Sequence, residues 1–138
     1  GGTYHKFPTA KAIADAGPAG LVPCRMGFRA RYLIDAAEKC QSGEIQLDTL
    51  KGADTEEAEA ALTAICGVGK KVAACTMLYG LHKTEAFPVD VWIRRVLDKY
   101  YPDGLDLATL GSYAGIAQQY LFYYEREKSS QVREKKRA

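Results

Sequence analysis

A glycine-pinched turn between two amphipathic segments constrains the fold of this chain more than any other feature. The turn lies at Gly67–Gly69, and an apolar segment follows it directly. Upstream, Asp54 with Glu57 three residues later predicts a helix start, after which apolar residues recur at helical spacing. Glycine can take a positive φ and leaves room for a close neighbour. The pattern predicts helix, hairpin, helix, and it fits both an ordinary αα-hairpin and a hairpin that binds phosphate through backbone amides.

The rest of the chain also favours helices, so the predicted fold class is all-α. No stretch alternates strictly between apolar and polar residues. Besides the pair around the turn, helices are expected at residues 9–16, 29–39, 47–51, 88–100 and 112–128. Gly17-Pro18 should end the first of them, and Pro88 should open the helix at 88–100. The predicted core stripe of the last helix is Tyr113, Ile116, Ala117, Tyr120, Leu121 and Tyr124.

Length and composition fit a small intracellular domain. The 138 residues can bury one core, which we place within residues 1–128. Residues 129–138 are basic and are expected to form a disordered tail. No apolar run is long enough to span a membrane, and no secretory signal opens the sequence. The four cysteines are widely spaced, which favours free thiols and gives no support for structural zinc.

The charge of the chain is informative only locally. A formal net charge of +2 by itself says little about DNA. Basic residues nevertheless cluster at Arg25, Arg29 and Arg31, at Lys70 and Lys71, and at Arg94 and Arg95. For any one cluster, a solvated surface is the ordinary explanation.

Four side chains could carry chemistry, and each has a plain structural alternative. Lys71 lies in the first turn of a helix, where it shares a face with Cys75 and Leu78, and it could be a surface charge. Asp90 near a helix start could be only a cap. Gln118 and Phe122 are neighbours at i and i+4, so they could read and stack a flat heterocycle or form a second packing surface.

Four motifs in order carry a resemblance to a known family. They are Gly27–Tyr32, the turn and helix start at Gly67–Ala73, the string Pro88–Val91, and Tyr113–Gln118 with Leu121-Phe122. From Phe7 to Tyr124 the chain resembles the helix-hairpin-helix DNA glycosylase superfamily, in particular its 8-oxoguanine DNA glycosylase/AP lyase branch. The resemblance implies the helical domain of that fold, truncated on its N-terminal side. Residues 1–128 would then be the C-terminal part of the glycosylase domain.

The resemblance implies base excision repair with two catalytic residues. Lys71 would attack C1′ of a flipped nucleoside to give a Schiff base, and β-elimination would then cleave the strand. Such a lysine must be partly neutral, which burial and the nearby Lys70 would promote by lowering its pKa. Asp90 would stabilise the oxocarbenium-like sugar and manage protons.

The resemblance also implies binding residues. Gln118 would read the base, Phe122 would stack on it, and Cys75 would pack against it. The expected DNA-contacting residues are Gly67, Val68, Gly69, Lys70, Phe28, Arg29 and Arg31. The carbonyls of Thr63, Ile65 and Val68 would bind a cation that bridges to DNA phosphate, and no cofactor is required. We expect a monomer whose partner is double-stranded DNA containing 8-oxoguanine, with no membrane contact, in the cytoplasm or nucleoid of a bacterium or the nucleus of a eukaryote.

Two departures limit the resemblance. Some relatives have histidine two residues after the aspartate, where this chain has Trp92. The family's preceding β-rich domain and first helical stretch have no counterpart here, so we expect a C-terminal fragment or an unusually short relative. The alternative function is a non-catalytic helix-hairpin-helix module that binds DNA backbone without specificity. That module would explain Gly67–Gly69 and the arginines, but it would not require Lys71, Asp90, Gln118 and Phe122 together.

Overall fold

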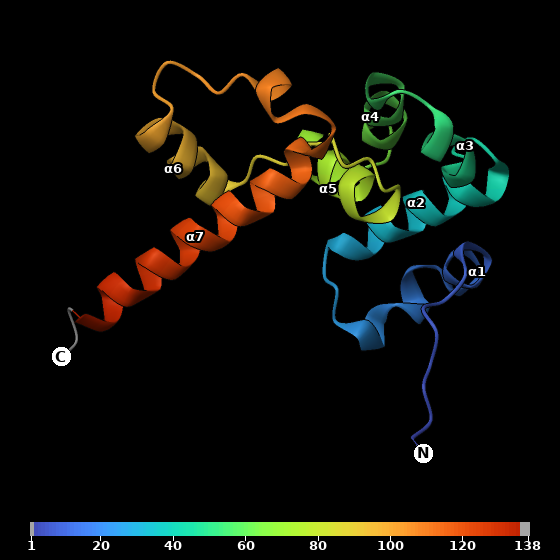
Figure 1. Cartoon of the computed structure of the whole chain (residues 1–138). Coiled ribbons are helices and arrows are strands. Elements are labelled where there is room, and N and C mark those ends of the chain that lie inside the picture. Colours follow the sequence, from blue (N-terminus) through green and yellow to red (C-terminus); the bar gives the residue numbers. More distant parts are fainter. Residues whose placement is uncertain (1, 136–138) are drawn as a thin grey trace. The chain divides into compact units, whose positions relative to one another are not determined.

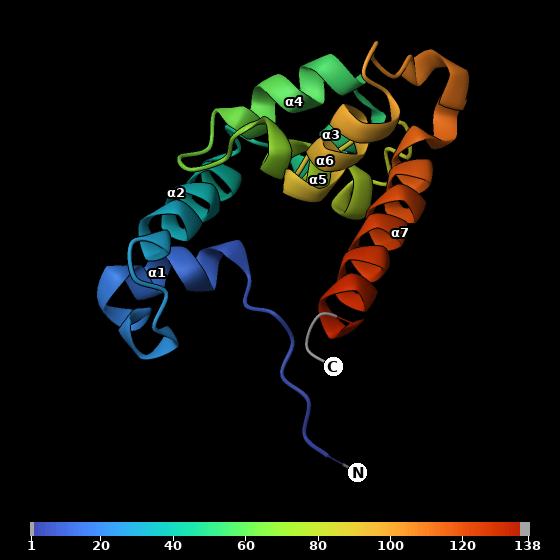
Figure 2. The same cartoon turned by 90° about the vertical axis from the view of Figure 1, so that its left-hand side faces the viewer.

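The computed structural model describes the backbone of residues 2–135 and the side chains of residues 2–130. The chain divides into two compact units at the junction between Gly69 and Lys70. Within residues 2–135 all regular structure is helical, which confirms the predicted fold class (Figures 1 and 2). The first unit contains α1 (Ala10–Gly20), the 3-10 segment η1 (Val22–Cys24), α2 (Arg29–Ser42), α3 (Leu47–Gly52) and α4 (Thr55–Thr63). The second contains α5 (Lys70–Gly80), α6 (Val91–Tyr100), the 3-10 segment η2 (Leu107–Tyr113) and α7 (Ala114–Lys135).

Helix starts follow the local capping signals. The Thr9 hydroxyl accepts a hydrogen bond from the amide of Ala12 at 3.2 Å, and an Asp54 oxygen accepts one from the amide of Glu57 at 2.8 Å. Gly17, with φ of 57°, interrupts α1 at the predicted stop. These bonds satisfy amides that the first helical turn leaves without partners.

The start of α6 corrects the sequence prediction. Pro88 does not open this helix, because α6 begins at Val91 with Asp90 as its N-cap. The aspartate takes over the role because its side chain can accept from the first free amides, whereas proline fits only the first helical position.

Each unit buries its own apolar residues. In the first, α1 and α2 pack together around Ile13, Leu21, Ile34 and Ala37 (Figure 1). In the second, α6 buries Ile93 and Val96, and it packs against α7. The single core predicted within residues 1–128 stays a prediction.

The face of α7 that turns inward is not the predicted stripe. Ala114, Gln118 and Glu125 are buried, whereas Tyr113, Tyr120 and Tyr124 are more than half exposed. Phenol rings tolerate this because their hydroxyls can be solvated. The buried carboxylate of Glu125 accepts a hydrogen bond from the Tyr100 hydroxyl at 3.2 Å and lies 3.6 Å from the Lys99 amine. The prediction failed because periodicity marks an apolar stripe but not the face that tertiary contacts select.

The last helix ends later than the sequence predicted. Its end was expected at Lys128, and in the structure α7 continues to Lys135. The expected disorder of residues 129–138 stays a prediction, and residues 136–138 lie outside the described residues. Over the part of the chain that is described, no helix combines the length and the apolarity needed to cross a membrane.

Candidate active site

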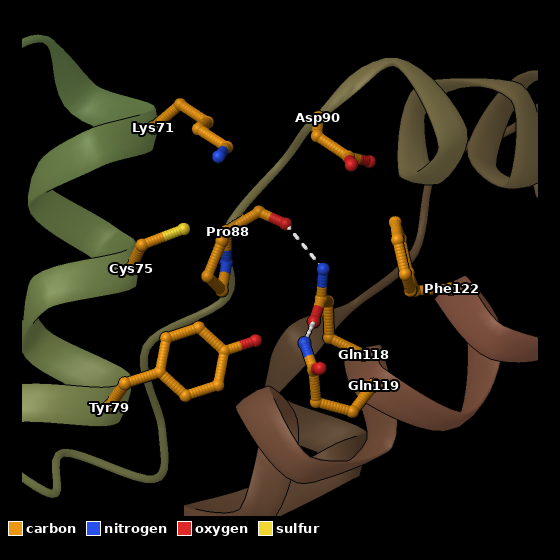
Figure 3. A pocket seen from close by; sticks show the side chains of 8 residues that line it. All are labelled: Lys71, Cys75, Tyr79, Pro88, Asp90, Gln118, Gln119 and Phe122. Carbon is orange, nitrogen blue, oxygen red and sulfur yellow. Dashed lines mark hydrogen bonds between the residues drawn. The ribbon is translucent and has the colours of Figure 1, made fainter.

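A pocket in the second unit collects side chains from three segments (Figure 3). Its walls come from α5, from the connection between α5 and α6, and from α7. The residues that line it are Lys71, Cys75, Tyr79, Pro88, Asp90, Gln118, Gln119 and Phe122. All five residues that the sequence assigned to catalysis and base binding are among them. The structure thus places them together, while their chemical roles stay predictions.

One face of α5 supplies a wall of the pocket. Lys71, Cys75 and Tyr79 follow one another at intervals of four residues, so they lie on one side of the helix. The sequence grouped Leu78 with the first two, but Leu78 is buried at 5% exposure and does not line the pocket. Tyr79 continues the row instead.

The Lys71 side chain reaches the pocket from the N-terminal end of α5, where its amine points inward in Figure 3. It is exposed in this chain, contrary to the expectation that burial would help to make it neutral. The described residues therefore do not bury this side chain.

Asp90 combines a structural role with a place in the pocket. Its Oδ1 atom accepts hydrogen bonds from the backbone amides of Trp92 at 2.9 Å and of Ile93 at 2.8 Å. Both capping bonds use the same oxygen, so the cap fixes the carboxylate without engaging Oδ2. The side chain is half-buried. The capping alternative raised by the sequence is thus present, and it is compatible with a carboxylate that acts in the pocket.

Gln118 is the most enclosed polar group of the site, at 2% exposure. Its side-chain nitrogen donates a hydrogen bond to the carbonyl of Pro88 at 2.8 Å, and its side-chain oxygen accepts one from the Gln119 amide. These partners satisfy a buried amide that would otherwise be costly to desolvate. The side chain is consequently held in one orientation beside the half-buried ring of Phe122.

The Tyr79 phenol adds a hydrogen-bond donor to the pocket. Burial raises its pKa, the Cys75 thiol and the Asp90 carboxylate raise it further, and the Lys71 amine opposes the change. The hydroxyl is therefore protonated at neutral pH and can donate.

Sequence reasoning missed Tyr79, Pro88 and Gln119 as pocket residues. The spacing of four residues from Lys71 through Cys75 could have indicated Tyr79. Nothing local could have indicated Gln119, because it lies next to Gln118 on a helix, where adjacent side chains ordinarily point in different directions.

The hairpin turn belongs mainly to the first unit, where α2 holds it in place. Gly67 has φ of 78°, and a Cβ atom built there would overlap the ring of Tyr32. Gly69 does not share the positive φ, and a Cβ atom there would meet nothing within 4 Å. The sequence expected both glycines to need conformational freedom, and only Gly67 does.

A side chain of α2 also hydrogen-bonds to the start of the turn. Asp35 Oδ2 accepts a hydrogen bond from the backbone amide of Cys66 at 2.7 Å, and its Oδ1 accepts one from the Lys39 amine at 2.9 Å. The Lys39 hydrogen bond and the Cys66 amide together lower the pKa of Asp35. Asp35 was not singled out from the sequence, because its partner lies far away along the chain.

The residues before and at the start of α2 form an exposed aromatic and basic surface. Phe28 is 62% exposed, and its ring meets that of Tyr32 edge to face at 5.8 Å. The guanidinium of Arg29 lies 4.8 Å from the Phe28 ring centre, and that of Arg31 lies 4.9 Å from the Tyr32 ring centre. Such stacking leaves the charges in water and available to phosphate. Lys70, the first residue of α5, is exposed in the second unit.

The carbonyls proposed for a cation lie between the last residue of α4, Thr63, and the turn residue Val68. Carbonyl oxygens are ligands for hard cations, so the donor chemistry at Thr63, Ile65 and Val68 fits. The Ile65 carbonyl already accepts a hydrogen bond from the Val68 amide at 3.0 Å, which leaves one of its lone pairs. Among the described side chains, no group of three or more histidine, cysteine or acidic residues could hold a metal ion.

The chain is similar to a family of DNA repair proteins and to N-glycosylase/DNA lyases. Residues 2–104 match the family described as the HhH-GPD superfamily of base excision DNA repair proteins. The chain is 34% identical over 121 residues to a probable N-glycosylase/DNA lyase of Methanothermobacter thermautotrophicus, covering 74% of this chain and 38% of that protein. It is 30% identical over 142 residues to the N-glycosylase/DNA lyase OGG1 of Arabidopsis thaliana, and this match covers 88% of this chain and 39% of that protein.

The fold is also similar to that of a solved glycosylase/lyase structure. The 8-oxoguanine glycosylase/lyase of Clostridium acetobutylicum, in complex with double-stranded DNA containing cytosine opposite 8-oxoguanine, superposes with a TM-score of 0.81 at 36% identity. The match covers 91% of this chain and 47% of that one. The chain therefore spans less than half the length of these relatives.

Proposed function

The chain belongs to the HhH-GPD superfamily of base excision DNA repair proteins, and from this premise we propose that it carries the base pocket of a bifunctional 8-oxoguanine DNA glycosylase/AP lyase. The whole protein would excise the oxidised base from double-stranded DNA and then cleave the strand. It would act in the compartment that holds the genome.

The observation that carries the proposal is the composition of one pocket. A lysine, a carboxylate, a buried amide and an aromatic ring meet there from three segments of the second unit. A module that only binds the DNA backbone does not require these four groups together. An enzyme that extrudes a base requires each of them, because it must hold a flat heterocycle and act on the sugar beside it.

Lys71 is the proposed nucleophile. Its amine would attack C1′ of the extruded nucleotide as the bond to the base breaks, and loss of a proton and opening of the sugar would leave an imine. Elimination of the 3′ phosphate would follow from that imine. DNA over the pocket would exclude water from this side chain.

Asp90 is the proposed electrostatic partner. The cap at α6 fixes Oδ1, which holds the carboxylate in place before the reaction begins. A fixed negative charge stabilises the positive charge that develops on the sugar more effectively than a mobile one. The same group could pass protons at the lysine.

The hairpin and the start of α2 are the proposed duplex contacts. The exposed Arg29 and Arg31 and the turn amides would bind phosphates, and Phe28 would contact the duplex at the base opposite the lesion. The carbonyls of Thr63, Ile65 and Val68 would hold a hard cation against a phosphate.

Borohydride trapping tests the proposal. The protein that contains this chain, expressed with its natural flanking sequence, is incubated with an 8-oxoguanine duplex and borohydride, which reduces an imine to a permanent cross-link. We expect a cross-link in the unaltered protein and none in Lys71→Gln, which keeps side-chain length but lacks the amine. Lys11→Gln, an exposed lysine on α1, is the matched control and should trap normally. Absence of any cross-link together with retained duplex binding would favour the non-catalytic module, and undiminished trapping in Lys71→Gln would refute the assigned nucleophile.

A further inference from the structure

The two adjacent glutamines of α7 form a directed hydrogen-bond chain inside the pocket (Figure 3). Gln119 donates to the side-chain oxygen of Gln118, and Gln118 donates to the backbone carbonyl of Pro88 at 2.8 Å. A backbone carbonyl can only accept, so the nitrogen of Gln118 must face Pro88 and its oxygen must face Gln119. The Pro88 carbonyl therefore fixes the direction of both hydrogen bonds.

This fixed direction matters because an amide can present either of two edges. Rotation by half a turn exchanges the donor and acceptor of a glutamine side chain and reverses the pattern that it can recognise. Each of the two internal bonds uses one donor or one acceptor of Gln118. One N–H and one lone pair are left, in a defined order, for a ligand.

We infer that Gln119 is a positioning residue, which holds the Gln118 amide in the orientation that recognises an N–H beside a C=O on the edge of a base. The inference rests on the proposed function of Gln118 as the base-reading residue. Guanine-type bases, including 8-oxoguanine, carry N1–H beside the C6 carbonyl on their Watson–Crick edge. On the same edge an adenine-type base such as 8-oxoadenine carries the N1 acceptor beside an amino group, which is the inverted pattern, while N7–H and the C8 carbonyl are common to both 8-oxopurines.

Burial explains why the partner is needed. Gln118 is 2% exposed, so bulk water does not supply the donor that Gln119 provides to its oxygen. Without that donor the buried oxygen would lose a hydrogen-bond partner, and the amide would no longer be held from both ends. Gln119 is half-buried, lines the same pocket and comes from the same helix.

The first test is spectroscopic and uses this chain itself. In the ¹⁵N-labelled chain, the side-chain amide protons of Gln118 should exchange slowly with solvent, because they are buried and bonded. Gln119→Leu keeps the volume and removes the donor, so it should shift these resonances and speed their exchange. The control is Tyr123→Phe, because Tyr123 lies on the same helix and is 66% exposed. This substitution should leave the Gln118 side-chain resonances unchanged. Unaltered Gln118 resonances in Gln119→Leu would overturn the inference whether or not the protein is an enzyme.

The second test measures selectivity in the protein with its natural flanking sequence. We expect Gln119→Leu to reduce the preference in kcat/KM for 8-oxoguanine over 8-oxoadenine by about tenfold, while binding to undamaged duplex is unchanged. Trapping by the unaltered protein, and its loss in Lys71→Gln, establish the proposed function separately. Normal trapping with an unchanged preference in Gln119→Leu would therefore overturn only the role of Gln119.

A charged variant supplies a readout that a merely structural role would not change. In Gln119→Glu, an ionised carboxylate would face the Gln118 oxygen, and selectivity should fall further than in Gln119→Leu. Protonation restores a donor, so selectivity should recover as the pH is lowered from 8 to 5. The titratable groups that face this position are Lys71, Cys75 and Tyr79 of α5 and Asp90 before α6, and the unaltered protein measured at each pH corrects for them. A pH-independent loss would contradict the inference.

Discussion

The pocket of the second unit and the hairpin turn of the first hold their polar groups by opposite means. In the pocket, side chains face inward and the backbone orients one of them, as the Pro88 carbonyl does for Gln118. At the turn, the backbone is the surface presented to solvent, and side chains hold it, as Asp35 does for the Cys66 amide. Gln118 is 2% exposed, whereas Cys66, Gly67 and Gly69 are exposed.

This difference has a physical consequence for recognition. A buried amide with fixed donors and acceptors can distinguish one heterocycle from another, because a wrong partner leaves a polar group unsatisfied. Exposed backbone amides meet the phosphates that all DNA shares, so they supply affinity without sequence information. Substitutions in the two regions should therefore separate selectivity from general binding.

The largest effect is expected from the charge in the pocket. Asp90→Asn keeps an oxygen that can cap α6 and removes the negative charge, so turnover should fall by about a hundredfold or more, with the free energy of unfolding changed by about 0.5 kcal/mol or less. Single-turnover kinetics and thermal unfolding measure the two effects. Asp54→Ala is the matched control, because Asp54 is also an N-cap. It should lower stability by about 1 kcal/mol and leave turnover unchanged. A variant Asp90→Asn that is fully active but less stable would show that Asp90 is only a cap.

The hairpin offers an internal contrast between two glycines. Gly67→Ala should lower the free energy of unfolding by about 1–3 kcal/mol, because its Cβ overlaps the Tyr32 ring at a positive φ. It should also weaken binding to damaged and undamaged duplexes alike. Gly69→Ala meets no neighbour within 4 Å, so it should fold normally and lose only affinity.

Competition binding at two salt concentrations sharpens this second prediction. Gln118→Ala should reduce the preference for the lesion and leave binding to plain duplex almost intact, with the usual salt dependence of phosphate contacts. If the Gly67 and Gln118 variants affected both duplexes equally, the base pocket would have been misplaced.

The smallest effect is expected at Asp35, and it should depend on pH. The pKa of this carboxyl is lowered in the folded chain, so its stabilising contribution is present above its unfolded pKa and is lost as the pH falls through the folded value. Asp35→Asn keeps an acceptor for the Cys66 amide and loses the ion pair with Lys39. Its stability should be slightly below that of the unaltered chain at pH 7, and the difference should shrink progressively as the pH falls below about 4. Urea unfolding over a series of pH values measures the difference, and salt should reduce it at pH 7. A difference that stayed constant as the pH fell would contradict the ionic explanation.

Much of the fold and of the candidate site could be read from local sequence. The all-helical class, the caps at Thr9 and Asp54, and the stop at Gly17 all follow from interactions within one helical turn. The motifs also predicted five site residues, which the structure places in one pocket: Lys71, Asp90, Gln118, Phe122 and Cys75. Their spacing along the chain could not show that they meet, and the family resemblance supplied that expectation.

What the sequence by itself determined were the properties that depend on near neighbours: helix type, capping and the turn at Gly67. Tertiary structure alone decided which face of α7 is buried, because both faces carry aromatic residues and only contacts with other segments choose between them. It also decided that Asp35 meets the Cys66 amide, 31 positions further along the chain, and that Pro88 directs the Gln118 amide from 30 positions away. Hydrogen bonds between distant residues leave no periodic signal, since their geometry exists only once the helices have packed.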